Sequence, residues 1–324
     1  IVGNDGDGDS VDGGLGVNDC SGFAKSTRCN RESPGNFGNR RTLVDISDGG
    51  IPIVMGGTQG DRIFVGYDGS NQWFRIIVAD GGVPSGNCRG VNQSPDSAIA
   101  QKIRCPANRN NLDGMLVYGG GGADRINVEN SVPPDMSTTL NGGDGKNVIH
   151  GGRSKDFIQT SFDSTGSEIF GGGNNDLMYA NDRVTIHGGG GTDHAQILRP
   201  CSGSLYSGGP GNDSAVFAGS PRGVKVDLGR GYVEWYHGHC GARTTLRPDI
   251  ERLEGSPHKD WMILGHRHRQ QQGRSSLLGR EGVNILNSRN GRRDTVTTGP
   301  AAHRNKVIRD RRDKVVWGWG LAAF

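Results

Sequence analysis

The apolar residues of this chain fall in short runs, and the spacing within the runs changes along the sequence. Between 42 and 118, apolar and polar positions alternate, as in 62–65 and 73–78, and Asp-Gly or Gly-Gly pairs separate the runs. Alternation with a period of two predicts strands that bury one face, and short glycine turns favour antiparallel neighbours. No segment carries a convincing helical period, so we expect an antiparallel β module here and almost no helix anywhere.

A nine-residue motif, G-G-x-G-x-D-x-U-x with U a large apolar residue, takes over after this stretch. It is complete at 119–127, and its frame of glycine and aspartate recurs at 188–193 and 208–213. Weaker copies start at Gly56, Gly142, Gly151 and Gly171, and a fragment lies at 9–16. Repetition at a short, nearly fixed period is typical of a solenoid, whose coils contact only their neighbours. The predicted fold is therefore all-β, a parallel β-roll or β-solenoid of glycine-rich nonapeptides, with the antiparallel module near its N-terminus.

The repeat length also predicts which residues meet. In a β-roll each nonapeptide supplies a turn and a short strand, and two nonapeptides complete one coil, so turns two repeats apart stack on the same edge. Two nonapeptides span 18 residues, and the glycine pairs that begin at 151, 171, 188 and 208 are 20, 17 and 20 residues apart. We expect one edge to stack Asp156, Asp176, Asp193 and Asp213, and a second, poorer edge to contain Asp124 and Asn147. The U residues should form a narrow interior ladder of Ile126, Ile149, Ile158, Met178 and Val216.

Aspartates stacked beside glycine turns suit calcium. This cation takes six to eight oxygen ligands, and a glycine turn can aim several carbonyls inward while Asp adds charge. The candidate ligands are the side chains of Asp124, Asn147, Asp156, Asp176, Asp193 and Asp213 and the turn residues Gly120, Gly122, Gly152, Gly172, Gly189, Gly191, Gly209 and Gly211. Because unpaired carboxylates at coil spacing repel each other, calcium should drive folding. The alternative is a set of glycine turns with surface Asp, and it weighs most at the uncharged Asn147.

These motifs resemble the haemolysin-type, repeats-in-toxin family of calcium-binding proteins, in particular its stand-alone secreted actinobacterial members. The segments 223–228 and 249–256 are similar to that family's mid-array insertion, and 290–296 and 310–316 are similar to its closing segment. The resemblance implies calcium as the cofactor and a β-roll over most of the chain. Two features depart from it: Thr298 stands where the closing segment often has Cys, and the tail at 317–320 has no counterpart.

Composition and charge refine this picture. The 324 residues include 57 Gly but only 32% hydrophobic residues, so the interior should be thin. The net charge is +3, yet Lys and Arg far outnumber Asp and Glu between 265 and 316, with Arg280, Arg292 and Arg293 where calcium turns carry Asp. This basic third is either a calcium-free continuation of the roll, held by contacts between Arg and carboxylates, or a patch for acidic cell-surface polysaccharide. No motif for specific nucleic-acid recognition is present.

Six cysteines fall into local pairs: Cys20 with Cys29, Cys88 with Cys105, and Cys201 with Cys240. None is in a CxxC motif, so three disulfides formed in an oxidising compartment are the favoured interpretation, although sequence does not fix the connectivity. The chain does not begin with Met, and it shows no signal peptide and no apolar run long enough to span a bilayer. We therefore expect a processed product that is secreted, extracellular or at the cell surface.

Other candidate chemistry is weaker. The sequence 1–4 is like an activated protease N-terminus and 8–10 is like a serine nucleophile motif, but both lie at one end with no His and Asp between them. Zinc ligands could come from 237–240 or from His258, His266 and His268; a disulfide at Cys240 would spoil the first set, and neighbouring arginines disfavour the second. The acids Asp5, Asp7, Asp9 and Asp12 form either a frayed repeat or a separate calcium site. We predict no catalytic residues.

The sequence thus predicts a secreted calcium-binding β-roll with a structural, surface or adhesive role, able to associate with itself end to end. The alternative is an accessory module of an exported polysaccharide-active enzyme. The expected organisation is a degenerate repeat with the Cys20/Cys29 loop (1–41), the antiparallel module (42–118), the calcium-binding roll (119–219), an insertion with a further repeat (220–264), and basic degenerate repeats with a C-terminal cap (265–324).

Overall fold

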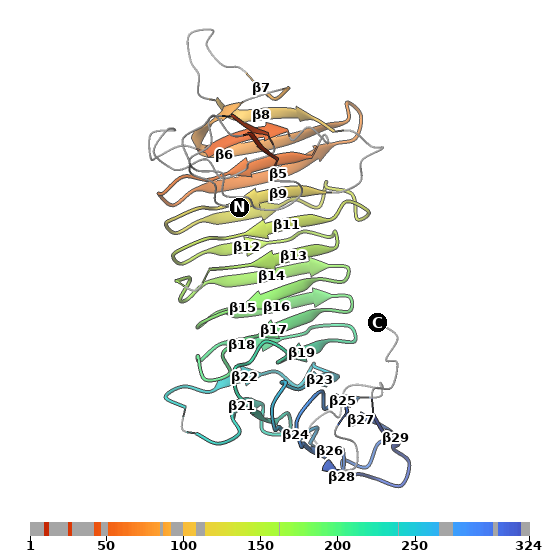
Figure 1. The fold of residues 1–324 in the computed structure, drawn as a ribbon. Coiled ribbons are helices and arrows are strands. Elements are labelled where there is room, and N and C mark those ends of the chain that lie inside the picture. The colour runs from red at the N-terminus through yellow and green to blue at the C-terminus, as the bar shows by residue number, and fades with distance from the viewer. Residues whose placement is uncertain are drawn as a thin grey trace. The chain divides into compact units, whose positions relative to one another are not determined.

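A computed structural model of the chain describes residues 10–12, 25–27, 42–46, 51–84, 87–91, 100–107, 114–161, 163–238, 240–265, 275–300 and 304–318. Strands and turns account for these residues, and no α-helix occurs among them that could cross a membrane. The chain divides into two compact units, unit 1 from Ile1 to Gly152 and unit 2 from Arg153 to Phe324. The all-β prediction is confirmed: parallel coils make a β-solenoid of about 9 turns, with an antiparallel module near the N-terminus (Figure 1).

The antiparallel module occupies the first part of unit 1. Its strands are β3 (Thr42–Ile46), β4 (Pro52–Met55), β5 (Arg62–Asp68), β6 (Trp73–Pro84), β7 (Arg89–Gly90) and β8 (Ala100–Pro106). Antiparallel pairs join β3 with β4, β5 with β6, β6 with β8 and β7 with β8. Alternate side chains, among them Ile63, Val65, Ile76 and Ile103, are fully buried, as the period of two predicts. A separate parallel pair is formed by β1 (Ser10–Asp12) and β2 (Lys25–Thr27).

The coils of unit 1 grow directly from this module. They contain β9 (Met115–Tyr118), β10 (Arg125–Val128), β11 (Thr138–Asn141) and β12 (Val148–His150). β9 pairs in parallel with both β4 and β11, and β10 pairs in parallel with both β5 and β12. β4 and β5 therefore have a parallel coil strand on one side and an antiparallel module strand on the other.

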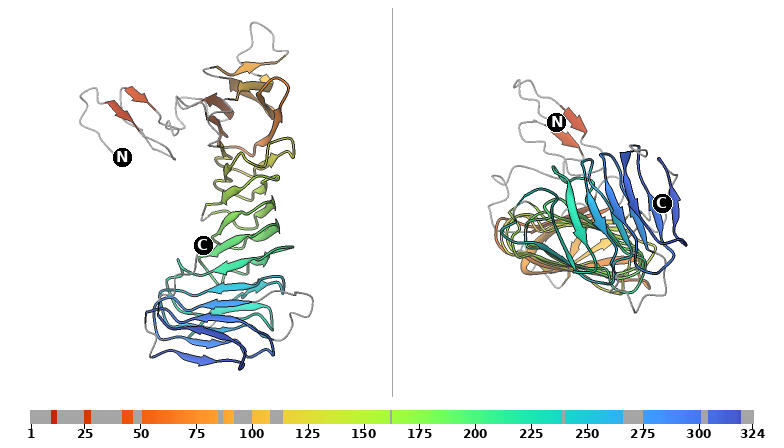
Figure 2. Two further views of the ribbon diagram at one scale, coloured as in Figure 1. Left: turned by 90° about the vertical axis from the view of Figure 1, so that its right-hand side faces the viewer. Right: turned by 90° about the horizontal axis from the view of Figure 1, so that it is seen from below.

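Unit 2 begins with regular parallel coils, drawn as green rungs in Figure 1 and seen from two other sides in Figure 2. One row contains β13 (Asp156–Gln159), β15 (Leu177–Ala180), β17 (His194–Ile197) and β19 (Ser214–Val216); the other contains β14 (Glu168–Gly173), β16 (Thr185–Gly190) and β18 (Leu205–Ser207). Ile158 and Met178 are fully buried in the first row, as expected. The prediction for Val216 is wrong, because Ala215 occupies the interior position in register with Ala195, and Val216 is half-buried.

An antiparallel hairpin then interrupts the coils. β20 (Val224–Asp227) pairs with β21 (Tyr232–Trp235), which pairs in turn with β22 (Thr244–Leu246), and β22 continues the row of β18. From here two parallel rows run to the end of the described chain. The first is β19, β23 (Arg252–Glu254), β25 (Ser276–Leu278), β27 (Thr295–Thr297) and β29 (Lys314–Val316). The second is β20, β24 (Trp261–Ile263), β26 (Ile285–Asn287) and β28 (Lys306–Ile308).

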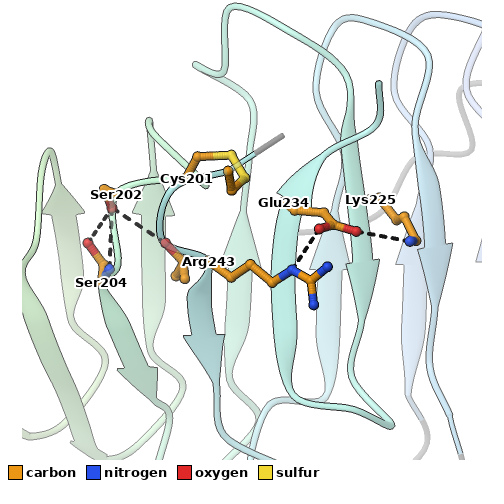
Figure 3. Close-up of a disulfide and its surroundings, with 8 residues drawn as sticks. Cys201, Ser202, Ser204, Lys225, Glu234 and Arg243 are labelled. Carbon is orange, nitrogen blue, oxygen red and sulfur yellow. Dashed lines mark hydrogen bonds and ion pairs between the residues drawn. A yellow bond between two sulfur atoms is a disulfide. The ribbon is translucent and has the colours of Figure 1, made fainter. Parts of the chain in front are cut away.

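Two of the expected cysteine pairs are bonded. Cys88 joins Cys105 at the edge of the antiparallel module, and Cys201 joins Cys240 at the base of the hairpin insertion (Figure 3). The third expected pair, Cys20 with Cys29, lies outside the described residues. Each observed bond closes a local loop: the first lies in the antiparallel module and the second beside the hairpin that interrupts the coils.

Candidate functional site

The four aspartates that the repeat places on one edge do stack in unit 2. Asp156, Asp176, Asp193 and Asp213 are at most 2% exposed. The backbone N–H of Asp156 donates to Oδ1 of Asp176 (2.9 Å), that of Asp176 to Oδ1 of Asp193 (2.9 Å), and that of Asp193 to Oδ1 of Asp213 (2.8 Å). The carboxylates of Asp176, Asp193 and Asp213 thus each accept a hydrogen bond from the coil before them, whereas that of Asp156 accepts one from Oγ of Ser154 in its own turn. We call these residues the Asp row.

The second carboxylate oxygen has a different environment. Oδ2 of Asp176, Asp193 and Asp213 is buried, and no hydrogen-bond donor reaches it from the residues that the structure describes. It faces the first glycine of its own turn: a Cβ added at Gly188 would lie 2.6 Å from Oδ2 of Asp193, and one at Gly208 would lie 2.5 Å from Oδ2 of Asp213. Glycine therefore leaves room beside each oxygen that a side chain would fill.

Burial makes these carboxylates hard to ionise without a partner. Desolvation raises the pKa of Asp176 to about 9, against the lowering effect of its backbone hydrogen bond. The same cause raises the pKa of Asp213 to about 7 and that of Asp193 to about 6. A buried oxygen with no donor costs roughly 1–3 kcal/mol, and more when it is charged. Protonation or a nearby cation would therefore stabilise Asp176, Asp193 and Asp213 in the folded chain.

The turns next to the row are in direct backbone contact with one another. The N–H of Gly189 donates to the carbonyl of Gly208 (2.9 Å) and the N–H of Gly191 to that of Pro210 (3.0 Å), so consecutive turns are in direct contact. Gly189 and Gly191 have φ of 110° and 140°, values that L side chains rarely adopt. A Cβ on Gly211, which has no positive φ, would overlap the carbonyl oxygen of Gly191. The predicted turn glycines thus lie where consecutive turns contact each other, next to the turn carbonyls.

The second expected edge lies in unit 1 and has one more member than predicted. The N–H of Asp61 donates to Oδ1 of Asp124 (2.7 Å), and the N–H of Asp124 donates to Oδ1 of Asn147 (2.8 Å). Burial raises the pKa of Asp124 to about 7, and its Oδ2 has no donor within the described part of the chain. Asn147 differs, because its Nδ2 donates to the carbonyl of Gly143 (3.1 Å). In Asn147 an amide nitrogen thus donates to the turn, whereas in Asp124 the corresponding atom is an oxygen that has no donor among the described residues.

The Asp row continues past the residues that the repeat identifies. The N–H of Asp213 donates to Oε2 of Glu251 (2.7 Å), and farther on the N–H of Asp294 donates to Oδ1 of Asp313 (3.0 Å). Desolvation raises the pKa of Glu251 to about 7 and raises that of Asp294. The weak glycine signal before Asp61 and the family-like segments at 249–256, 290–296 and 310–316 could have located these residues.

A third row, in unit 2, holds its polar atoms by hydrogen bonds within the chain. Asp260 accepts from the N–H (2.8 Å) and Oγ (2.6 Å) of Ser256. Its N–H donates to Oδ1 of Asn284 (2.8 Å), whose Nδ2 donates to the carbonyl of Glu281 (2.9 Å). Nδ2 of Asn305 donates to the carbonyl of Thr298 (2.7 Å). The residues of this row have donors or acceptors within the chain, whereas Oδ2 of Asp176, Asp193 and Asp213 has no donor among the described residues.

The donor set fits a hard cation. It consists of carboxylate oxygens from successive coils and of turn carbonyls, which calcium prefers and which zinc does not. Among the described residues, no three His, Cys, Asp or Glu side chains cluster, so turn carbonyls would have to complete any site. Cys240 is bonded to Cys201 and is not available as a zinc ligand; His237 and His258 are exposed. His266, His268, Asp5, Asp7 and Asp9 lie outside the described residues, as do the side-chain contacts of Asp12.

In the basic third, Arg280 shows the kind of contact expected for a calcium-free continuation. Its Nε lies 2.8 Å from Oε1 of Glu254, on the strand one coil earlier. Arg293 is exposed to solvent, and Arg292 is half-buried, with its N–H donating to Oδ1 of Asn290 (2.9 Å). The arginines of this region thus differ in their roles.

Comparison with known proteins adds no further constraint. No family model matches the chain. No curated protein matches it either.

Proposed function

We propose that the chain is a secreted, calcium-binding β-roll protein with a structural, surface or adhesive role. One observation carries the proposal: buried carboxylate oxygens of Asp176, Asp193 and Asp213 repeat along a stack of glycine turns without a hydrogen-bond donor from the described chain. Repetition at coil spacing separates this arrangement from an isolated buried acid. A cation that accepts oxygen ligands is the partner that the arrangement fits best.

The residues that would hold calcium are the Asp side chains of neighbouring coils and the carbonyls of their turns. In unit 2 these are Asp156, Asp176, Asp193 and Asp213 with the turns around Gly172, Gly189, Gly191 and Gly209; in unit 1 the Asp124 turn is the equivalent. A bound divalent cation supplies the positive charge that lets buried carboxylates stay ionised. The resemblance of the nonapeptides to haemolysin-type repeats supports the same assignment.

Two disulfides support the extracellular location, because such bonds persist in oxidising compartments. An ion held between coils acts as a crosslink, so we assign calcium a stabilising role and propose no catalytic step. An accessory module of an exported polysaccharide-active enzyme is the second candidate, and an exposed row of cations and aromatic rings on unit 2 favours it. A catalytic domain encoded in the same reading frame would support the second candidate over the first.

Calcium titration of the metal-depleted full chain tests the proposal. We expect calcium, followed by isothermal titration calorimetry, to bind at several sites and to raise the unfolding temperature, whereas equimolar magnesium does so far less. At a free calcium concentration 100 times the dissociation constant, each site adds about 2.7 kcal/mol to the free energy of unfolding. Failure of calcium to change either the heat signal or the unfolding temperature would refute it.

Two reciprocal substitutions make the test specific. In Asp193→Asn the new amide can donate to its turn as Asn147 does, so we expect a folded protein with fewer calcium sites. In Asn147→Asp the amide donor is lost, so the metal-free protein should lose roughly 1–3 kcal/mol of stability, which calcium restores. Asp260→Asn is the matched control, because Ser256 already donates to that carboxylate, and its calcium stoichiometry should equal that of the unmodified chain.

A further inference from the structure

The outer face of the hairpin sheet in unit 2 carries a row of cations and aromatic rings. Inward positions on these strands, including Val226, Met262 and Leu286, are fully buried, so the alternate positions point outward. The strand register places Lys225 beside Trp261, Trp261 beside Ile285, and Ile285 beside Lys306. These outward residues lie on four adjacent parallel strands, β20, β24, β26 and β28.

Cations and rings alternate at short range on this face. The guanidinium carbon of Arg243 is 4.4 Å from the ring centroid of Tyr232, and Nζ of Lys225 is 5.8 Å from the same ring and 5.6 Å from that of Trp261. Glu234, the cross-strand partner of Lys225 on the same face, pairs with both cations: its Oε1 is 2.9 Å from Nζ of Lys225 and its Oε2 is 2.7 Å from Nε of Arg243 (Figure 3). We call Arg243, Tyr232, Lys225, Trp261 and Lys306 the cation–aromatic face.

The face is positive and partly apolar at its surface. Glu234 is 8% exposed and its charge is paired with two cations, whereas the side chain of Arg243 is 55% exposed and Lys306 is exposed. The other acid on the face, Asp227, lies 3.7 Å from Nε of Arg230. Trp261 is 36% exposed and is one of two large hydrophobic side chains exposed in the described residues.

We propose that the cation–aromatic face binds an extended acidic polysaccharide that crosses the strands. The exposed indole ring of Trp261 can stack against the C–H face of a sugar ring, and Lys and Arg pair with carboxylate or sulfate groups. Successive strands are about 4.8 Å apart, a spacing close to the rise of one sugar unit in an extended chain. A flat row across several strands suits a polymer, whereas a small ligand favours a concave pocket.

This site does not depend on calcium in the Asp row. The row beneath these strands consists of Asp260, Asn284 and Asn305, whose side chains are hydrogen-bonded to turn groups of the chain itself. The face should therefore keep its structure whether or not the Asp row is loaded, so failure of glycan binding and failure of calcium binding are separate results.

Affinity electrophoresis and calorimetry of the full chain test the proposal with polygalacturonate, dextran sulfate and neutral dextran as probes, at one fixed calcium concentration. We expect binding to polygalacturonate or to both acidic polymers, with weakening at high salt, and none to neutral dextran. Retention by only one acidic polymer identifies carboxylate or sulfate as the recognised group. Equal binding of neutral dextran, no binding of either acidic polymer, or tighter binding of duplex DNA overturns the proposal.

Matched variants locate the site. Trp261→Ala and Lys306→Glu should each raise the dissociation constant by about tenfold or more. Trp317→Ala and Lys314→Glu are the controls: Lys314 is an exposed Lys on β29, and Trp317 is an exposed Trp that directly follows this strand. Both should change the dissociation constant by less than about twofold. Lys225 is left intact because it pairs with Glu234. Equal losses in the control variants would place binding elsewhere, and circular dichroism with calcium titration verifies that each variant is folded.

Discussion

A single atom distinguishes two kinds of turn in this solenoid. Where Asn147 follows a glycine turn, its Nδ2 donates to the turn carbonyl of Gly143, and at Asn284 the amide does the same to Glu281. Where Asp193 or Asp213 occupies the equivalent place, the carboxylate oxygen Oδ2 replaces the amide donor. No hydrogen-bond donor reaches this oxygen among the described residues. At these positions, therefore, an amide pairs with its own turn, whereas a carboxylate leaves one buried oxygen without a donor from the described chain.

The raised pKa values give the metal-free protein an unusual pH dependence. Asp176, Asp213 and Asp193 have pKa values of about 9, 7 and 6 in the folded chain, against 3.8 for an ordinary Asp. Because the folded state holds protons that the unfolded state releases, these groups stabilise the fold at low pH and lose that effect as the pH rises through the folded values. We expect the metal-depleted protein to melt at a higher temperature at about pH 5 than at about pH 8.

Calcium should reverse this trend, because it binds the ionised carboxylates. The paired acid Glu234 does not interfere, since its lowered pKa places its titration below this pH range. Melting curves followed by circular dichroism at both pH values, with and without calcium, make the comparison. A metal-depleted protein that is more stable at the higher pH would show that the row carboxylates are ionised without a cation.

At the scale of the element, the turns are set by contact between coils. Gly189 has a φ of 110°, and a Cβ placed there would overlap the carbonyl oxygen of Gly172 in the preceding coil. Its neighbour Gly190 has no positive φ, and nothing lies within 4 Å of a Cβ built on it. Two adjacent glycines of one motif therefore have opposite tolerance to a side chain.

Alanine substitution should separate these two glycines. We expect Gly189→Ala to lower the free energy of unfolding by roughly 1–3 kcal/mol, because it adds a strained backbone and a steric overlap. Gly190→Ala should leave it within about 0.5 kcal/mol. Urea unfolding at a saturating calcium concentration measures both values. Equal effects at the two positions would mean that turn stacking does not constrain this motif.

The ends of the coil stack limit how whole molecules associate. In unit 1 the first coil strands, β4 and β5, are already paired with β3 and β6 of the antiparallel module. In unit 2 the last described strands, β28 and β29, carry the exposed Lys306 and Lys314. Lysine on an edge strand opposes pairing with another edge, especially with an identical one. In the described part of the chain, β28 and β29 each pair with one coil strand, and their lysines oppose pairing with another copy.

We accordingly expect the protein to be monomeric at low ionic strength and to form pairs, not filaments, if the edge is made apolar. Lys314→Val should promote dimers, because it removes a charge that repels the same edge of a second copy. Sedimentation velocity over a range of concentrations and salt measures the species present. Filaments of the unmodified chain in electron micrographs would contradict this expectation and would support the end-to-end assembly that the sequence suggests.

The two observed disulfides each close a loop of the chain. Cys201–Cys240 closes the loop around the hairpin, where the row that contains β18 ends at β22 and a new row starts at β20. It therefore fixes the base of the insertion that carries Arg243, Tyr232 and Lys225 of the cation–aromatic face. The pair Cys88–Cys105 holds the short edge strand β7 near β8.

The sequence by itself determined the local repeat. A glycine frame, one Asp and one apolar residue per motif predicted parallel coils, the stacked edge from Asp156 to Asp213, and the pairing of Asp124 with Asn147. The period of two similarly predicted the antiparallel module. These features are encoded locally, because a turn needs glycine within a few residues and a strand buries alternate side chains.

Only the tertiary structure decided what each carboxylate contacts. Asp213 is followed in its row by Glu251, which the hairpin insertion separates from it in sequence, and Asp61 joins Asp124 across the antiparallel module. The hydrogen bonds that Ser256 donates to Asp260 follow from the shape of their turn, and the placement of Lys225 beside Trp261 follows from the register of β20 with β24. Hydrogen bonds between coils join residues that are separated by variable lengths of sequence, so no short motif predicts them. The free energy of a buried carboxylate nevertheless depends mainly on these hydrogen-bond partners.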